Sequence, residues 1–153
     1  MCVRLRRYTQ RDLQQVLRLF YDTVHTVCTG DYTEEQLRAW APWPPDYDRW
    51  QRSLSAQYTI VAEQGGQLVG FGDLALPGYL DRLYVHRDFQ RQGVATRLCD
   101  MLERRAKSPV IETHASITAR PFFEKRGYTT WCEQRVCREG VILTNYAMRK
   151  PLF

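Results

Sequence analysis

The most informative segment of this 153-residue chain reads Leu83-Tyr84-Val85-His86-Arg87-Asp88-Phe89-Gln90-Arg91-Gln92-Gly93-Val94-Ala95-Thr96. Its apolar opening predicts the end of a strand, its polar middle a loop, and its last residues the start of a helix. The first amides of a helix lack acceptors within it and lie at the positive end of the helix dipole, so they bind anions. Gly93 and Ala95 leave room for a phosphate and Arg91 adds charge. The segment lacks the GxxxxGK[ST] and GxGxxG motifs, yet it predicts a site for a pyrophosphate-bearing ligand.

The residues before this segment predict a β-hairpin. Tyr58-Thr59-Ile60-Val61-Ala62-Glu63 reads as a strand, and Leu68 to Ala75 reads as its return. Gln64-Gly65-Gly66-Gln67 between them is typical of a tight turn. A second turn at Pro77-Gly78 leads into the strand that contains Leu83. These strands therefore precede the anion site directly.

After this segment, strands and helices alternate. The helix beginning near Gly93 places Val94, Leu98, Met101 and Leu102 on one side. Val110 to His114 predicts a strand, and Thr118 to Arg126 a short helix that ends at Gly127. The last two predicted strands are Trp131 to Arg138 and Val141 to Met148.

The first third of the chain predicts mainly helices after a short strand at Val3 to Arg6. Thr9-Gln10-Arg11-Asp12 and Thr33-Glu34-Glu35-Gln36 both have the form of a capping box, which marks a helix start. Apolar residues at helical spacing follow the first box, and Leu37 and Trp40 follow the second. Ala41-Pro42-Trp43-Pro44-Pro45 must end the second helix, because proline lacks the N–H donor. Asp46 to Ala56 predicts a further short helix.

The order of these elements predicts the fold class. We expect one α/β (α+β) domain over residues 1–153, with a mixed, largely antiparallel central sheet of about six to seven strands flanked by helices. Its length is enough for a core of its own.

Composition excludes several other classes of protein. The chain is 44% hydrophobic and 25% charged, as in ordinary soluble domains, and no apolar run approaches the roughly 20 residues of a membrane span. Basic residues at the N-terminus precede no apolar segment, so we expect no secretory signal and a cytoplasmic protein. The five cysteines show no CxxC spacing, which favours free thiols over disulfides or a metal site. The net charge of +5 is dispersed, so we expect no nucleic-acid partner.

Two blocks carry a family resemblance. Gln90-Arg91-Gln92-Gly93-Val94-Ala95 matches the Q/R-x-x-G-x-G/A signature of the GNAT superfamily of acetyl-coenzyme A-dependent N-acetyltransferases. Ala119-Arg120-Pro121-Phe122-Phe123-Glu124-Lys125-Arg126-Gly127-Tyr128 resembles the later A-x-x-F-Y-x-K-x-G-F block of that family. The regions Tyr32 to Trp40 and Ala115 to Ala119 resemble the YafP-like bacterial branch. The resemblance implies an acetyltransferase that uses acetyl-CoA and no metal and acts on a small-molecule or peptide amine.

The resemblance also implies where acetyl-CoA binds. The backbone of Leu83 to Val85 would pair with the pantetheine arm, and the amides of Gln92 to Thr96 would hold the pyrophosphate. Ser116 stands where many members carry a cofactor-binding asparagine. Phe123 stands where many members have the tyrosine that protonates the leaving thiolate, a role that phenylalanine cannot take. The full set of implied cofactor residues is Leu83, Tyr84, Val85, Gln90, Arg91, Gln92, Gly93, Val94, Ala95, Thr96, Ser116, Phe122 and Phe123.

Candidate acids and bases lie on the predicted central strands. Asp73, Asp81 and His114 are candidate bases that could deprotonate the amine, since a lysine-like amine has a pKa of about 10.4. A structural role for His114 is the alternative, and Asp81 could equally face water. Tyr146 could replace the missing acid, although core packing of such a tyrosine is more common. Tyr84 is a weaker candidate of the same kind.

Aromatic residues gather in the early helical region, which borders the acceptor pocket in this superfamily. Tyr32, Trp40 and Trp43 are the predicted pocket residues, with Trp50 nearby, and core packing is the alternative. Two other functions remain open: a catalytically silent acyl-CoA-binding regulatory domain, which Phe123 and Ser116 favour, and a nucleic-acid-binding domain. Late strands in such folds can pair between subunits, so the resemblance allows a homodimer.

Overall fold

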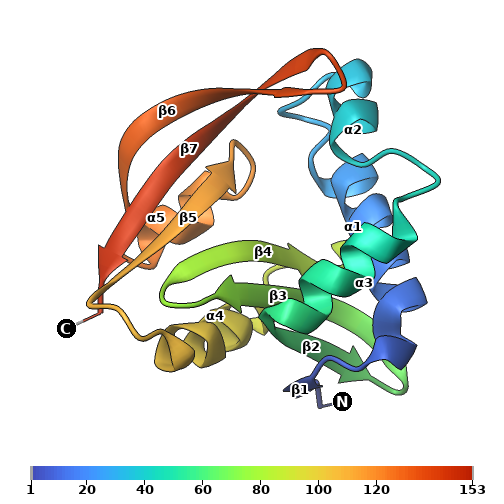
Figure 1. Cartoon of the computed structure of the whole chain (residues 1–153), viewed down its shortest axis with the longest axis vertical. Helices are drawn as coiled ribbons and strands as arrows, with labels where there is room; N and C mark the ends of the chain where they lie inside the picture. The colour runs from blue at the N-terminus through green and yellow to red at the C-terminus, as the bar shows by residue number, and fades with distance from the viewer. Residues whose placement is uncertain (1, 153) are drawn as a thin grey trace.

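The computed structural model describes residues 2–152 and contains one mixed sheet with helices on both faces (Figure 1). The α-helices are α1 (Leu13–Val27), α2 (Glu34–Trp40), α3 (Tyr47–Ala56), α4 (Val94–Arg105) and α5 (Arg120–Lys125), with short 3-10 turns η1 (Gln10–Asp12) and η2 (Arg87–Phe89). The strands are β1 (Arg4–Arg7), β2 (Tyr58–Gln64), β3 (Gln67–Ala75), β4 (Tyr79–Val85), β5 (Val110–Ser116), β6 (Thr129–Arg138) and β7 (Val141–Pro151).

The seven strands follow the order β1-β2-β3-β4-β5-β7-β6. Every neighbouring pair is antiparallel except β4 and β5, which are parallel. This arrangement confirms the predicted mixed, largely antiparallel sheet flanked by helices.

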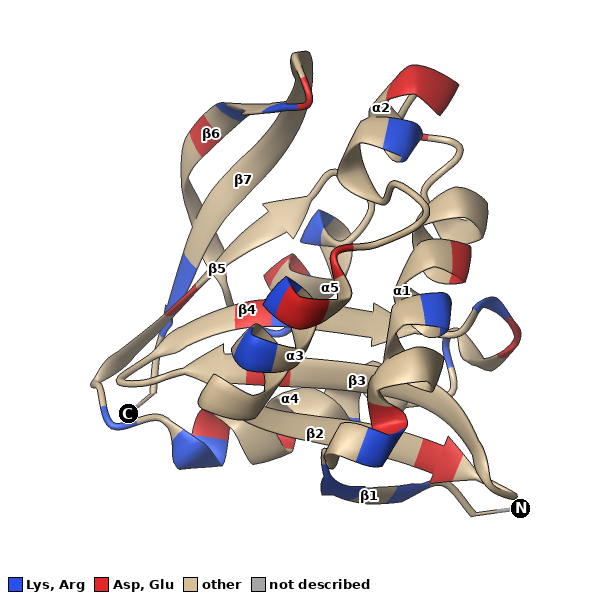
Figure 2. Ribbon diagram, turned by 45° about the vertical axis from the view of Figure 1, so that its right-hand side comes forward, with Lys and Arg blue, Asp and Glu red and all other residues tan. Residues whose placement is uncertain are grey.

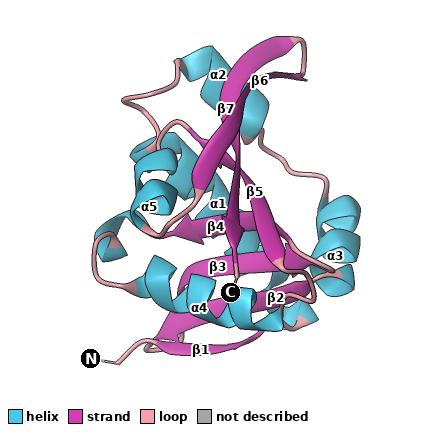
Figure 3. Cartoon of the chain, turned by 90° about the vertical axis from the view of Figure 1, so that its left-hand side faces the viewer, coloured by secondary structure: helices cyan, strands magenta, loops and turns pink. Residues whose placement is uncertain are grey.

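Alternate residues of the central strands divide between two cores, as the period of a strand requires. Ile60 and Val69 pack with helix α4 and β5, whereas Val61 and Phe71 pack with α1, α2 and α3. The sheet therefore separates α4 on one face from α1, α2 and α3 on the other (Figure 3).

Glycines on β3 bring helix α4 unusually close to the sheet. A Cβ atom added at Gly70 would lie 3.1 Å from Val94 Cγ1 and 3.3 Å from Leu98 Cδ1. One added at Gly72 would lie 3.1 Å from Leu102 Cδ1 of the same helix. Both positions are tighter than ordinary van der Waals contact, so the absence of side chains there sets the height of α4 above β3.

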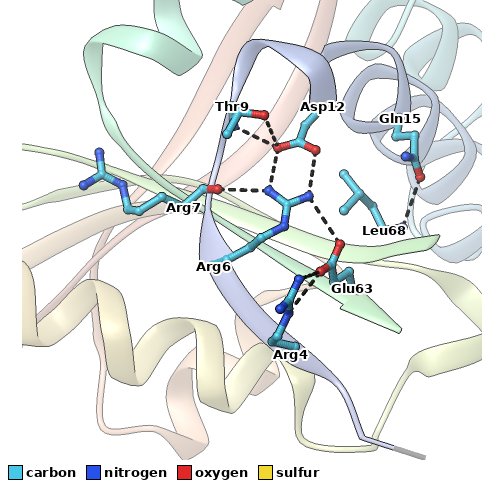
Figure 4. Close-up of polar contacts among 8 residues, drawn as sticks. All are labelled: Arg4, Arg6, Arg7, Thr9, Asp12, Gln15, Glu63 and Leu68. Atoms are coloured by element: carbon cyan, nitrogen blue, oxygen red, sulfur yellow. Dashed lines mark hydrogen bonds and ion pairs between the residues drawn. The ribbon is translucent and has the colours of Figure 1, made fainter. Parts of the chain in front are cut away.

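An ion-pair cluster links β1 to the 3-10 turn η1 that precedes α1 (Figure 4). Arg6 donates hydrogen bonds of 2.9 and 2.8 Å to the two carboxylate oxygens of Asp12, and a third of 3.3 Å to Glu63 on β2. Arg4 also pairs with Glu63. Asp12 accepts a 2.8 Å hydrogen bond from the amide of Thr9, which confirms the first predicted capping box.

Most predicted elements are confirmed, and their ends shift by a few residues. Helix α2 ends at Trp40, directly before the Ala41–Pro45 segment, and the Gln64–Gln67 hairpin turn is present. The fifth helix begins at Arg120 and not at Thr118, because Ser116 Oγ accepts a 3.0 Å hydrogen bond from the Ala119 amide and holds a turn there. The last strand runs on to Pro151, since it pairs with β5 as far as Val110.

All five cysteines are free. Within residues 2–152 no group of three or more His, Cys, Asp or Glu side chains has the geometry of a metal site. No helix in this part of the chain has both the length and the apolar character needed to cross a membrane. Charged residues of both signs are interspersed along α1, α3 and α4 (Figure 2).

Candidate active site

Strands β4 and β5 pair over a very short distance and then run apart (Figures 1 and 3). The registered parallel pairs are Tyr79 with Glu112 and Leu80 with Thr113, and among the described residues β4 has no further partner on this side. On the opposite side Asp73 pairs with Arg82 while Leu74 pairs with Leu80, so Asp81 is the extra residue of a β-bulge. The strand from Leu83 to Val85 therefore presents a free backbone edge toward β5.

The loop after this edge turns directly into helix α4. Gly93 is the N-cap residue with φ of 84°, and Arg91 also has a positive φ of 60°. Within residues 2–152 no side chain caps the helix, and the first amide bonded back to Gly93 is that of Arg97, which donates to Gly93 O at 3.1 Å. The amides of Val94 to Thr96 are therefore free, and Gln90 Nε2 donates a 2.5 Å hydrogen bond to Val85 O that holds the loop against β4.

The free edge and the helix start lie in one large cleft of about 1360 Å³. Ligand pockets are typically roughly 300–1,000 Å³, so the cleft has room for two molecules. All of the predicted cofactor residues line it except the exposed Gln92. Their assignment as cofactor ligands remains a prediction.

The end of the cleft away from α4 is walled by aromatic rings. Tyr84 on β4 meets Phe20 of α1 with ring centroids 4.9 Å apart and Trp40 of α2 at 6.4 Å. Trp50 of α3 lies 4.8 Å from Phe20. These four side chains and Tyr32 line the cleft and form what we call the aromatic end.

Tyr32 also has a structural role at this end. Its hydroxyl donates a 2.6 Å hydrogen bond to the carbonyl oxygen of Thr144 and accepts one of 2.9 Å from the amide of Ile117. Burial raises the pKa of this hydroxyl. Tyr32 therefore ties the loop after α1 to β7 and to the segment after β5.

Trp43, the third predicted pocket residue, is not among the residues that line the cleft. Its side chain is 42% exposed and packs against Tyr21, with ring centroids 5.2 Å apart, and against the guanidinium of Arg18 at 5.1 Å. Trp43 lies in the proline-containing segment that follows α2. The prediction of a pocket role for Trp43 therefore needs correction.

The candidate bases occupy different environments. Asp81 lines the cleft at the bulge and accepts a 3.2 Å hydrogen bond from Gln57 Nε2. His114 also lines it and is exposed, with its ring 5.2 Å from that of Tyr79. Asp73 does not face the cleft, because it is fully buried and pairs with Arg82 at 2.6 Å. Burial raises the pKa of Asp73 to about 6, and its ion pair with Arg82 links β3 to β4.

The two candidate acids lie on opposite faces of the sheet. Tyr146 packs in the core on the α4 side, with the guanidinium of Arg120 4.1 Å from its ring centroid, and does not line the cleft. Tyr84 lines the cleft, and burial raises the pKa of its hydroxyl, which therefore stays protonated. The tyrosine that sequence reasoning ranked lower is the better placed of the two.

Two implied cofactor residues are partly committed to the fold. Ser116 Oγ is engaged by the Ala119 amide, as described above. Phe123 is 2% exposed and packs edge-on against Phe122 and Tyr128, with centroids 5.3 and 5.0 Å away.

Sequence reasoning missed Thr23, Arg82 and Asn145, which also line the cleft, because nothing in their local sequence distinguishes them from core or surface residues.

Known proteins with the same architecture identify the family. Residues 28–150 match the family model described as acetyltransferase (GNAT) domain. The chain is 35% identical to the uncharacterized N-acetyltransferase YafP of Escherichia coli K12, over 97% of each chain. It superposes on the crystal structure of a GCN5-related N-acetyltransferase from Rhodopseudomonas palustris with a TM-score of 0.95 and 34% identity, covering 99% of this chain and 96% of the other.

A more distant structure shares the fold alone. The PaiA N-acetyltransferase of Thermoplasma acidophilum superposes with a TM-score of 0.80 at 16% identity, over 99% of both chains.

The free strand edge, the uncapped helix start and the nearly full-length matches lead to one conclusion. The chain belongs to the GNAT family and is an acetyl-CoA-dependent acetyltransferase of its YafP-like branch.

Proposed function

We propose that this protein is a cytoplasmic, single-domain N-acetyltransferase that moves an acetyl group from acetyl-CoA to the primary amine of a small molecule or peptide by direct attack. One observation carries the proposal: a free strand edge, an open helix start and an aromatic end share one cleft. The first two features suit a long anionic cofactor, and the third suits an acceptor beside its reactive end.

The shape of the helix start suits a pyrophosphate. None of the residues that the structure describes lies within 4 Å of a Cβ atom added at Gly93, so the backbone there is open to a ligand. We assign the pyrophosphate to the amides of Gln92 to Thr96 with Arg91 nearby, and the pantetheine arm to the free edge of Leu83 to Val85. The structure of the similarly folded PaiA was determined in complex with coenzyme A, which supports this assignment.

The chemistry that the cleft must perform is the making of an amide. Bound acetyl-CoA supplies an activated thioester. The amine nitrogen attacks the thioester carbonyl, the C–N bond forms and the C–S bond breaks, so no acyl-enzyme is required. Of the groups that line the cleft, Asp81 and His114 are the candidates to take the proton from the amine. We assign the donation of a proton to the departing sulfur to Tyr84, which lines the cleft and would replace the tyrosine missing at Phe123.

The test is calorimetric titration of acetyl-CoA into wild type and Gly93→Glu, which puts bulk and negative charge at the pyrophosphate site. Gly66→Glu is the matched control, because Gly66 has φ of 83°, is equally open and lies in the β2–β3 turn. We expect micromolar binding by wild type and Gly66→Glu and none by a folded Gly93→Glu. Equal binding by both variants would show that the pyrophosphate is not bound at Gly93. An absence of acetyl-CoA binding by wild type would refute the proposal.

A second function is favoured by one observation. Phe123 stands where many members of the family have the tyrosine that protonates the leaving thiolate. Its lack of a hydroxyl suits a catalytically silent acyl-CoA-binding regulatory domain. Binding of acetyl-CoA without turnover of any amine in a broad library would establish that function in place of catalysis.

A homodimer and the absence of a nucleic-acid partner remain predictions, to be checked by light scattering and by a salt-dependent gel shift.

A further inference from the structure

Helix α1 places an unusual hydroxyl in the cleft wall. Thr23 is 5% exposed, and its Oγ1 has no hydrogen-bond partner among the residues that the structure describes. Thr26 on the same helix behaves in the ordinary way, since its hydroxyl donates a 2.6 Å hydrogen bond to the carbonyl oxygen of Asp22. The helix could satisfy Thr23 in the same manner but does not.

The surroundings of Thr23 make this hydroxyl costly. Thr23 lies between Phe20 and Val27 on the side of α1 that lines the aromatic end, together with Trp40 and Tyr84. A buried hydroxyl without a partner destabilises a fold, whereas valine has nearly the same shape and no such cost. A purely structural position of this kind would favour valine.

The cleft offers a partner that the fold does not. Threonine in a helix uses more than one rotamer, and Thr23 lines the cleft, so its hydroxyl is free to rotate toward a bound molecule. A molecule at the aromatic end can then complete the missing hydrogen bond. Nearby rings provide flat apolar walls, and this hydroxyl adds a single polar contact.

We propose that Thr23 determines acceptor specificity by hydrogen bonding a polar group on the body of the acceptor, and that the acceptor is an amine with a flat apolar body carrying such a group. This inference rests on the proposed acetyltransferase function and deepens it. A site built to bond a hydroxyl discriminates against the analogue that lacks it, because the group of the site is left unpaired.

The test uses tyramine and phenethylamine, two amines that differ by one hydroxyl, in a thiol-release assay with acetyl-CoA. Wild type should prefer tyramine by about tenfold in kcat/KM, the effect of one hydrogen bond. Thr23→Val should abolish the preference by raising the KM of tyramine, with the KM of acetyl-CoA unchanged. Thr26→Val is the matched control on the same helix, outside the cleft lining, and should keep the preference.

Melting temperature separates a ligand role from a structural one. Thr26→Val should melt lower than wild type, since it loses the bond to Asp22, while Thr23→Val should melt at the same temperature or higher. A drop in Thr23→Val equal to that in Thr26→Val would show that the hydroxyl has a partner in the fold and would overturn the inference. Equal use of both amines by wild type, or acetylation of neither by a protein that binds acetyl-CoA, would also overturn it. Failure to bind acetyl-CoA would instead refute the proposed function.

Discussion

Gly70→Ala tests whether the close approach of α4 to β3 positions the cofactor site. The new methyl would lie 3.1 and 3.3 Å from side-chain carbons of Val94 and Leu98 and 3.3 Å from the carbonyl oxygen of Tyr84. Overpacking of this kind costs about 1–3 kcal/mol, offset by about 0.4–1 kcal/mol from the stiffer unfolded chain. We therefore expect a net loss of about 1–2 kcal/mol in the free energy of unfolding.

Urea denaturation measures this loss directly, and a Tm lower by about 2–8 °C should accompany it in a domain of this size. Because Val94 is the first residue of α4, the helix start should also shift and weaken acetyl-CoA binding in calorimetry. Gly30→Ala is the control, since a Cβ there meets nothing within 4 Å, and it should not be destabilised. Equal stability of the two variants would refute the claim that these glycines set the height of the helix.

Two further variants test the ion-pair cluster and the candidate acid. The hydrogen bonds from Arg6 lower the pKa of Asp12 below its ordinary value of 3.8, so the stability they provide is complete above that pH and is lost as the pH falls through the lower folded pKa. Asp12→Asn should lose about 1–3 kcal/mol in urea denaturation at pH 7 and show a flatter pH profile in acid; an unchanged profile would contradict the assignment. Tyr84→Phe should lower kcat by about 100-fold while calorimetry shows unchanged acetyl-CoA binding, and a wild-type kcat would exclude Tyr84 as the acid.

Local sequence rules were enough for the hairpin and for the proline stop after Trp40, because both depend on residues close together in the chain. The faces of β4 were not predictable in this way. Leu80 and Leu83 are three residues apart and yet both pack toward α4, because the bulge at Asp81 adds one residue and reverses the alternation. That reversal is set by pairing with β3 and has no local signal.

The candidate site was predictable only in part for the same reason. Residues of the helix start follow one another in sequence, so the motif located them. The aromatic end is assembled from α1, α2, α3 and β4, and its members lack a common spacing. Whether Tyr84 or Tyr146 faces the cleft depends on which face of the sheet each strand presents, which pairing of distant segments decides.

The bonds made by Tyr32 have a consequence for how the protein folds. Its hydroxyl joins residues separated by 85 and 112 positions in the chain, so a long loop must close before either bond can form. Contacts of such long range form slowly compared with a local hairpin such as β2–β3. The contacts that Tyr32 makes with β7 and with the segment after β5 should therefore form late in folding, after the part of the sheet that packs against α4. Exchange of the Ile117 amide hydrogen with deuterium, followed during refolding, would report when the aromatic end of the cleft forms.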